Sequence, residues 1–484
     1  MRHISKEIFL NTLFCPTLGW RIRHNKVHRS LSPGDRFRME QGKEIGGIAR
    51  ELYPDGIYIY NPDLTAAAFR TEDLLRNLPS GVLFEGTFIA GDCVAKADIL
   101  VKYGDSLELI EVKSGLNAKQ DHIDDMAYTT IVASKSGFNP TTVSLLLLDK
   151  KYRMGMDQRF LFKKMDVTQE VFSRVDEFLP LVSTVESVSG QPREPDAGLS
   201  YNCRQCDFFS ECMGKGIDAH IFEIPRLRQK NAEELIHQGI HSIHSIPGHF
   251  PLSPAQKKAV ECVQCNRISI DPGLLRQLEK VQWPAHYLDF ETMMIAIPPF
   301  EDIAPYDHIP IQYSIHLCDH CGHIIRHFEY MADPERDCRR ELAEHLIRDL
   351  DGNGSIITYS SYEKTTISKL SSLFPDLSDT LRSLNARIID LEKSVKCVRH
   401  PQFRGRTSIK VVLPVLVPDL SYDRLEISNG DTAMVTFACM AKGEMDQEEM
   451  ERKRAALLEY CKLDTLAMVR MHEKLDKMRD IPRE

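Results

Sequence analysis

The stretch Ser106-Leu-Glu-Leu-Ile-Glu-Val-Lys113 predicts a β-strand with two charged side chains at its end. Successive side chains of a strand point to opposite faces, so Glu111 and Lys113 project on the same side of the sheet. We expect Asp98 to close the preceding strand and to meet this pair. Two carboxylates suit Mg²⁺ or Mn²⁺, and a lysine beside the cation can position water for attack on phosphorus. The pattern favours phosphodiester hydrolysis, with the solvated end of an edge strand as the alternative.

Four of the 13 cysteines bracket this pair of strands. The chain starts Met1-Arg-His-Ile-Ser-Lys-Glu, without the apolar stretch of a secretion signal, so we expect a reducing, cytoplasmic environment. There, a Cys-x2-Cys-x5-Cys spacing predicts thiolates that hold a metal ion or a cluster. A fourth thiolate comes from an N-terminal helical segment, and tetrahedral zinc is the alternative to a cluster. The four candidate ligands are Cys15, Cys203, Cys206 and Cys212.

The order of these motifs along the chain is one cysteine, the acidic strands and then three cysteines. This order resembles that of the RecB-like nucleases of the PD-(D/E)xK superfamily that carry an iron–sulfur cluster. The resemblance covers residues 1–215 and implies a restriction-endonuclease-like core that cuts DNA. In that core Asp98 and Glu111 would bind the metal, Lys113 would serve the attacking water, and Glu85 would supply an extra carboxylate. The resemblance also implies that the four cysteines hold a [4Fe-4S] cluster.

One later helix of this half departs from the family pattern. The relatives usually carry a Gln-x3-Tyr pair there. This chain has Asp125 and Tyr128 in the corresponding segment, and we expect a helix around them.

A second acidic centre is predicted in the other half of the chain. The apolar strand expected over residues 286–292 carries two acidic residues on one face, Asp289 and Glu291. Residues 448–478 predict a long amphipathic helix on which Tyr460 and Asp464 lie one turn apart. An acidic residue on the packed face of a helix costs stability unless it is paired or bound to a cation, so Asp464 is expected to meet the acidic strand. Such carboxylates can hold two divalent ions about 3.5–4 Å apart, and Tyr460 would orient the attacking water.

This half resembles the DnaQ-like 3′–5′ exonucleases of the RNase H-like superfamily, in the subgroup whose last motif is Tyr-x3-Asp. Leu288-Asp-Phe-Glu-Thr292 matches the first motif and Tyr460-Cys-Lys-Leu-Asp464 the last, and Glu363 stands where the middle motif has an aspartate. The resemblance implies four metal-binding carboxylates: Asp289, Glu291, Glu363 and Asp464. The two resemblances occur together in a bacterial family that fuses a RecB-like nuclease to a DnaQ-like domain, and the match includes residues 420–433.

We therefore expect an α/β protein of three parts. A PD-(D/E)xK core over residues 1–215 is followed by a small helical connector over 216–283 and an RNase H-like mixed-sheet domain over 284–484. Within the connector, residues 231–244 predict two short helices joined through Gly239. They either form a helix-hairpin-helix that binds phosphate or pack as a plain hairpin. No apolar run approaches the length of about 20 residues that a membrane span needs.

The net charge of −9 argues against binding of nucleic acid by bulk electrostatics. Local basic patches remain, over Arg226–Lys230 and over Arg399–Arg406. The second patch, together with the nearby Lys410, supplies the residues that we expect to contact a nucleic-acid strand: Arg404, Arg406 and Lys410. Two further cysteine pairs, Cys262 with Cys265 and Cys318 with Cys321, either form a zinc site or are free thiols.

These observations favour a metal-dependent exonuclease with Mg²⁺ or Mn²⁺, acting on single-stranded or end-bearing DNA, with a helicase or a repair or defence protein as partner. Two alternatives stay open. One is a single active nuclease whose other domain only holds the strand, and the other is a non-catalytic adaptor that binds nucleic acid.

Overall fold

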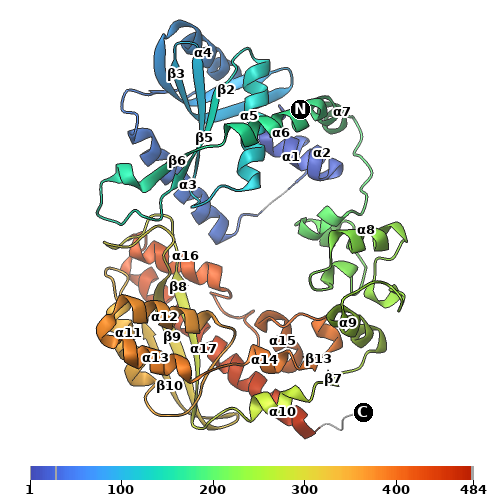
Figure 1. The fold of residues 1–484 in the computed structure, drawn as a ribbon, viewed down its shortest axis with the longest axis vertical. Coiled ribbons are helices and arrows are strands. Elements are labelled where there is room, and N and C mark those ends of the chain that lie inside the picture. The colour runs from blue at the N-terminus through green and yellow to red at the C-terminus, as the bar shows by residue number, and fades with distance from the viewer. Residues whose placement is uncertain (1, 28–29, 481–484) are drawn as a thin grey trace. The chain divides into compact units, whose positions relative to one another are not determined.

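The computed structural model describes residues 2–27 and 30–480 and divides the chain into two compact units, shown with their elements in Figure 1. The first unit comprises Met1–Gly198 together with Ile295–Asp307, and the second comprises Leu199–Met294 and His308–Glu484. Both units mix helices with strands, so the chain is an α/β protein. The residues predicted as a connector belong to the second unit.

The first unit is built on a six-stranded sheet in which the strands follow one another in sequence order. Strands β2, β3 and β4 form an antiparallel meander, whereas β4 and β5 run parallel. A parallel pair needs a crossover connection, and helix α5 supplies it. The strands are β1 Ile57–Tyr58, β2 Ser80–Ala90, β3 Cys93–Tyr103, β4 Ser106–Lys113, β5 Thr142–Leu148 and β6 Phe162–Asp166.

Seven α-helices accompany this sheet: α1 Lys6–Phe14, α2 Pro16–Arg23, α3 Pro33–Glu51, α4 Leu64–Asn77, α5 Gln120–Lys135, α6 Thr168–Phe178 and α7 Val182–Gly190. Tyr128 on α5 is fully buried, and its hydroxyl group donates to the carbonyl oxygen of Ile4. Its ring also lies 4.9 Å from that of Phe9 on α1. The same hydroxyl lies 3.4 Å from the carbonyl oxygen of Val94, so Tyr128 ties the start of the chain to the beginning of β3.

The second unit contains a mixed five-stranded sheet in the order β10-β9-β8-β11-β12. Strand β9 pairs antiparallel with both β8 and β10, whereas β11 adds parallel to β8 and β12 parallel to β11. The strands are β8 Ala285–Met293, β9 Ile309–His320, β10 His323–Met331, β11 Ile356–Thr358 and β12 Ile388–Asp390. A separate two-stranded ribbon pairs β7 Ser269–Ile270 with β13 Val398–Arg399.

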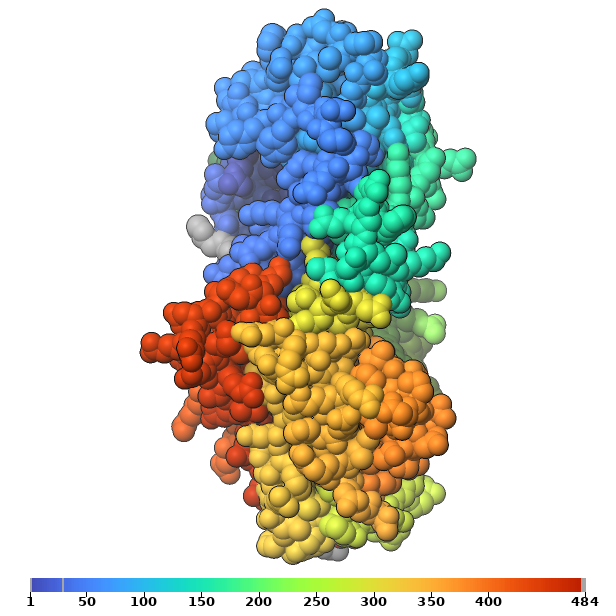
Figure 2. Space-filling model, turned by 90° about the vertical axis from the view of Figure 1, so that its left-hand side faces the viewer, coloured from blue at the N-terminus to red at the C-terminus, as the bar shows by residue number. Residues whose placement is uncertain are grey.

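Ten α-helices belong to this unit: α8 Gln229–His237, α9 Pro254–Cys265, α10 Gly273–Leu278, α11 Arg339–Asp349, α12 Tyr362–Leu373, α13 Ser378–Ala386, α14 Glu392–Val395, α15 Ile409–Leu416, α16 Gly430–Ala441 and α17 Gln447–Lys477. The long predicted C-terminal helix is confirmed as α17, which packs on β8 and β9. In the space-filling view of Figure 2, red residues near the C-terminus lie beside yellow residues from the middle of the chain.

The predicted connector has its own apolar core around Ile221, Leu235 and Ile243. The chain reverses after α8 at Gly239, whose φ of +72° lies in the left-handed region that favours glycine. The second short helix expected after Gly239 is only a 3₁₀ turn over Ile243–Ser245, and a full helix follows as α9. None of the described helices is long and apolar enough to cross a membrane.

Candidate functional site

The acidic pair of the first unit lies on two neighbouring strands. Asp98 in β3 stands opposite Glu111 in β4, and the backbone N–H of Val112 donates to the Asp98 carboxylate at 2.8 Å. The prediction that Asp98 closes its strand was wrong. Strand β3 continues to Tyr103 because β3 and β4 keep their pairing up to the turn. The side chain of Glu111 is only 4% exposed, so its charge needs a partner.

Two lysines supply that partner charge. The Nζ atoms of Lys6 and Lys113 each lie 3.0 Å from Oε1 of Glu111. Both also approach Asp125 on α5, at 3.4 Å and 2.8 Å respectively. Lys113 and Asp125 thus lie at the acidic strands as the sequence suggested, whereas Lys6 was missed. Lys6 precedes the strands by about a hundred residues in sequence, and only the folding of α1 brings it to them.

Glu85 contributes from an irregular position in β2. Strand β2 begins at Ser80, so Glu85 lies inside the strand. Glu85 has a φ of +58° and lies between two regular pairs that β2 makes with β3. A left-handed residue other than glycine is strained, and such strain concentrates at functional sites. Burial, the charge of Glu111 and, to a smaller extent, that of Glu85 raise the pKa of Asp98 to about 7.

The acidic centre of the second unit lies where β8 meets α17. Asp289, Glu291 and Asp464 each offer an oxygen atom within 4.8 Å of the others. The helix is held in register by β9, because Thr465 on α17 hydrogen-bonds to Ser314 at 2.8 Å and to the ring of His316 at 2.7 Å. The predicted meeting of Asp464 with the acidic strand is therefore observed.

Glu363 lies in the first turn of α12, directly after β11. The connecting residue Ser360 has a φ of +90°, and its backbone N–H donates to the Asp390 carboxylate at 3.0 Å. Asp390 thereby fixes the loop that carries Glu363. The glutamate is 2% exposed, and its Oε2 atom has no hydrogen-bond partner among the described residues. An unpaired buried carboxylate oxygen is costly unless a cation or a proton satisfies it.

The electrostatics of this centre follow from the buried carboxylates Glu291, Glu363 and Asp464 and the partly exposed carboxylate of Asp289. Burial, together with the charges of Asp464 and Glu291, raises the pKa of Asp289 well above its usual range. Burial raises the pKa of Glu291 to about 8 and that of Glu363 to about 8 as well. The pKa of Asp464 rises less, to about 6, because hydroxyl groups of Tyr422 and Tyr460 and the charge of Lys410 oppose the effect of burial.

Tyr422 was not predicted as a functional residue. Its hydroxyl group donates to Oδ1 of Asp464, and its ring lies 5.9 Å from that of Tyr460. Burial raises the pKa of both hydroxyl groups, so both stay protonated at neutral pH. Residues 420–433 were noted as part of the family pattern, but nothing in their spacing indicates that Tyr422 would reach α17.

The predicted cluster ligands fall in both units, with Cys15 in the first and the other three in the second. These three lie in consecutive turns, since the N–H of Cys206 donates to the carbonyl oxygen of Cys203 at 3.2 Å and that of Cys212 to Phe208 at 3.0 Å. Thiolate sulfur atoms fit both iron–sulfur clusters and zinc. The cluster itself stays a prediction.

The three residues predicted to contact a nucleic-acid strand have different surroundings. Arg404 forms ion pairs with Asp218, at 2.7 Å, and with Glu223, so its guanidinium group is already engaged. Arg406 lies 3.4 Å from Glu223 and is exposed. Lys410 is an exposed residue in the first turn of α15 and acts on the carboxylates described above.

The two further cysteine pairs lie in different surroundings. Cys262 and Cys265 belong to α9, and Arg399 is the charged residue that acts on Cys262. Cys318 and Cys321 lie at the turn between β9 and β10, where Asp476 and Glu473 of α17 act on Cys321. Burial raises the pKa of Cys318 and Cys321 to about 12, so these thiols are protonated at neutral pH.

One family match is found for the chain. A domain of unknown function (DUF2779) matches residues 286–408, which begin in β8 and end just before α15. The matched region includes Asp289, Glu291 and Glu363 but neither Tyr460 nor Asp464. No curated protein matches the sequence.

Proposed function

We propose that the protein is a metal-dependent exonuclease and that the centre at β8, α12 and α17 hydrolyses phosphodiester bonds at nucleic-acid ends. The observation that supports this most is the meeting of Asp289, Glu291 and Asp464 within 4.8 Å. Like charges at this spacing in a buried place cost free energy unless cations or protons compensate them. Mg²⁺ or Mn²⁺ fits this donor set, because all its ligand atoms are carboxylate oxygens. The charge of Glu363 also acts on Glu291, and the Oε2 atom of Glu363 has no hydrogen-bond partner in the described part of the chain.

A divalent cation held by these carboxylates would activate water and stabilise the leaving oxygen. The protein's own side chains would hold the metal ligands, orient the water and offset the charge of the phosphate group. Tyr422 and Tyr460 hold Asp464 through their hydroxyl groups, and Tyr460 orients the attacking water. Lys410 offsets the negative charge that a phosphate group adds when it approaches the carboxylates.

The first unit supplies the second candidate centre, with Asp98 and Glu111 as metal ligands and Lys113 beside the water. The contacts of Glu111 support this assignment, because two ammonium groups at 3.0 Å balance it until a metal ion competes for the same oxygen atoms. Glu85 adds a further carboxylate nearby. We propose DNA with a free single-stranded end as the substrate of both centres.

The experiment that tests this proposal is digestion of strands labelled at the 5′ or the 3′ end, with Mg²⁺ or Mn²⁺. We expect Asp98→Asn and Asp289→Asn each to abolish one mode of degradation. Asp105→Asn and Asp379→Asn, which change exposed aspartates of the first and second unit, serve as matched controls. If only one of the two variants has an effect, the other domain is a strand-binding platform. If the wild-type protein degrades neither strand with either ion, the exonuclease proposal is wrong and the adaptor alternative is supported.

A further inference from the structure

A groove of about 1420 Å³ lies within the second unit, apart from the carboxylates. One wall comes from the connector, over residues 225–231 and 251–259, and the other from residues 392–408. Pockets for small ligands usually enclose roughly 300–1,000 Å³. The size of this groove therefore fits a polymer better than a small molecule.

The groove is strongly basic. Its lining carries one carboxylate, that of Glu392, which Lys396 and Thr407 already engage at 2.7 Å each. Against it stand five cationic side chains: Arg226, Arg228, Lys230, Lys396 and Arg406. An adjoining hollow that shares Lys396 and Arg406 adds Lys258 and Arg399. This concentration of positive charge is exceptional in a chain with a net charge of −9.

Three of these cations are free to bind a ligand. Arg226, Arg228 and Lys230 are exposed, and no ion pair with another described residue engages them. All three come from the connector. The connector thus contributes the unpaired positive charge, while the opposite wall contributes charge that is partly neutralised.

The N-termini of three helices add to the positive potential of the groove. Arg228 and Ser408 are the N-cap residues of α8 and α15, Ser253 is that of α9, and all three line the groove. The N-terminus of a helix carries a partial positive charge and unpaired backbone N–H groups, which attract phosphate. The helix N-termini thus reinforce the positive charge that the arginine and lysine side chains of the groove supply.

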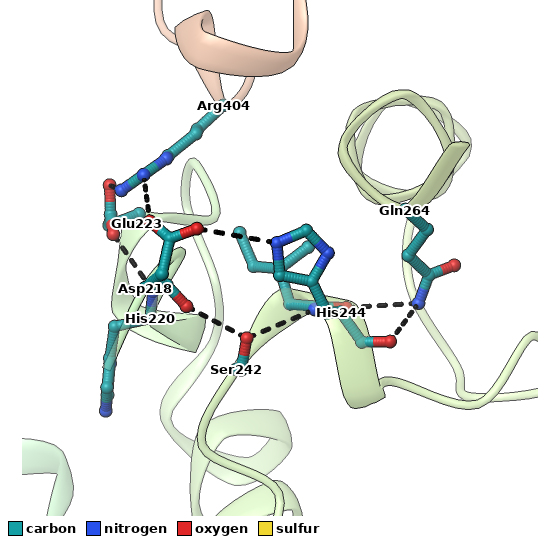
Figure 3. Close-up of polar contacts among 8 residues, drawn as sticks. Asp218, His220, Glu223, Ser242, His244, Gln264 and Arg404 are labelled. Carbon is teal, nitrogen blue, oxygen red and sulfur yellow. Dashed lines mark hydrogen bonds and ion pairs between the residues drawn. The ribbon is translucent and has the colours of Figure 1, made fainter. Parts of the chain in front are cut away.

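The two walls are fastened to each other. Figure 3 shows Arg404 reaching from one wall to Asp218 and Glu223 of the connector, whose turn is closed by the hydrogen bond from Ser242 to the Asp218 carbonyl oxygen. Next to it, Gly405 has a φ of +77°, and a Cβ atom there would meet Ala259 and Pro225 at 3.0 Å. Arg404, which was predicted to contact a nucleic-acid strand, therefore joins the two walls of the groove. The next residue, Gly405, must be small.

One wall of the groove is linked to the carboxylates through neighbouring residues. Ser408 lines the groove, and Lys410, two residues further on, acts on Glu291 and Asp464. A second connection runs through Tyr359, whose hydroxyl group donates to the carbonyl oxygen of Thr407, another lining residue. Tyr359 immediately precedes the loop that carries Glu363. Both connections join the end of the groove to the proposed hydrolytic centre.

We infer that this groove binds the phosphate backbone of a single nucleic-acid strand and guides its end to the carboxylates of the second unit. The inference rests on the proposed function, and it assigns the connector a role in holding substrate. No aromatic side chain belongs to the described residues that line the main groove. Since bases are usually held by stacking on aromatic rings, the groove recognises the backbone and is indifferent to sequence.

The test is strand binding by the full-length protein in EDTA, measured as fluorescence anisotropy of a labelled single-stranded oligonucleotide. We expect a triple variant, R226E/R228E/K230E, to lose affinity at least about tenfold and to lower the salt dependence of binding by about two in slope, since each phosphate contact on a single strand adds about 0.7. K369E/R382E/K474E, at exposed positions elsewhere in the same unit, serves as the matched control and should bind like wild type.

Hydrolysis of a small diester, bis(4-nitrophenyl) phosphate with Mn²⁺, separates this inference from the proposed function. Hydrolysis and strand degradation are both measured in an Asp98→Asn background, which leaves only the centre of the second unit active. There the groove variant should keep this hydrolysis and lose strand degradation, whereas Asp289→Asn should lose hydrolysis and keep strand binding. If wild type binds strands but hydrolyses nothing, the proposed function fails and the groove stands. Undiminished strand binding by the groove variant would overturn the inference. Equal binding of wild type to blunt duplex, or binding to phosphatidylserine vesicles in place of strands, would overturn it as well.

Discussion

At the scale of single residues, the hydroxyl group of Tyr422 sets the charge state of Asp464. It donates to Oδ1 of that carboxylate and opposes the effect of burial, so that the pKa of Asp464 rises only to about 6. Tyr422→Phe removes the donor, so the pKa of Asp464 should rise. We expect the acidic limb of the pH–activity profile to move to higher pH, with activity at pH 6 falling about fivefold if the pKa rises by about one unit.

The control for this prediction is Tyr103→Phe, because Tyr103 is 80% exposed and lies in the other unit. Its profile should match that of the wild-type protein. If Tyr422→Phe lowers activity equally at every pH, the hydroxyl group positions Asp464 without setting its charge.

Protons and metal ions compete for the same carboxylate oxygens in the second unit. The pKa of Glu291 and of Glu363 is raised to about 8, in both cases chiefly by burial. In the folded, metal-free protein these groups therefore hold protons near neutral pH that the unfolded chain has already lost. Their contribution to stability is present at low pH and disappears as the pH rises through about 8.

Metal binding must displace these protons, so we expect the dissociation constant for Mn²⁺ to fall by up to about tenfold per pH unit, for each proton released, between pH 6.5 and 8.5. Isothermal titration calorimetry in two buffers with different ionisation enthalpies measures both the affinity and the number of protons released. Asp289→Asn is the negative control. An affinity that does not change with pH would contradict this account of the centre.

At the scale of elements, strand β2 carries a strained residue where the first unit presents its acidic pair. Glu85 has a φ of +58°, and the left-handed conformation costs a side chain roughly 1–2 kcal/mol. Glu85→Gly removes both the strain and the carboxylate, whereas Glu85→Gln removes only the charge. We expect both variants to weaken degradation by the first unit, and only the glycine variant to raise the free energy of unfolding, by about 1 kcal/mol.

Urea denaturation and the end-label assay measure the two effects separately. If Glu85→Gly destabilises the protein while Glu85→Gln leaves degradation intact, the carboxylate serves the fold of β2 and not the acidic centre. That outcome would remove Glu85 from the candidate site.

Elements with a strong local pattern could be predicted from the sequence. Strand β4 has the predicted bounds, β8 includes the predicted strand 286–292, and α17 lies within one residue of the predicted helix 448–478. In each case the spacing of apolar residues already contains the period of the element. The same spacing put Asp289 and Glu291 on one face and Asp464 on the packed side of its helix.

Contacts that depend on distant parts of the chain could not be predicted. Lys6 reaches Glu111 from a segment that the backbone of Ile4 and the hydroxyl of Tyr128 hold on the sheet. Tyr422 reaches Asp464 from a segment without regular structure, and Arg404 pairs with acidic residues about 180 positions earlier. No local period encodes such contacts, because burial and charge pairing in the folded protein determine them.

At the scale of the whole molecule, the proposed cluster concerns cysteines from both compact units. We expect protein purified without oxygen to be brown and to contain about four iron and four sulfide ions per chain, as a [4Fe-4S] cluster requires. Cys206→Ser and Cys15→Ser should each lose most of the iron and lower the melting temperature, because bound metal stabilises only the folded state. Cys397→Ser, outside the four candidate ligands, is the matched control.

The two ligand variants separate the remaining outcomes. Loss of iron in Cys206→Ser with full retention in Cys15→Ser would remove Cys15 from the ligand set and leave the fourth ligand to another residue. A colourless protein that holds one zinc ion and loses it in Cys206→Ser would replace the cluster by a tetrahedral zinc site. Degradation assays on the same variants then show whether the metal serves only stability. Unchanged hydrolysis of the small diester at a lowered melting temperature is the expected result, because the cysteines are not among the proposed ligands of either hydrolytic centre.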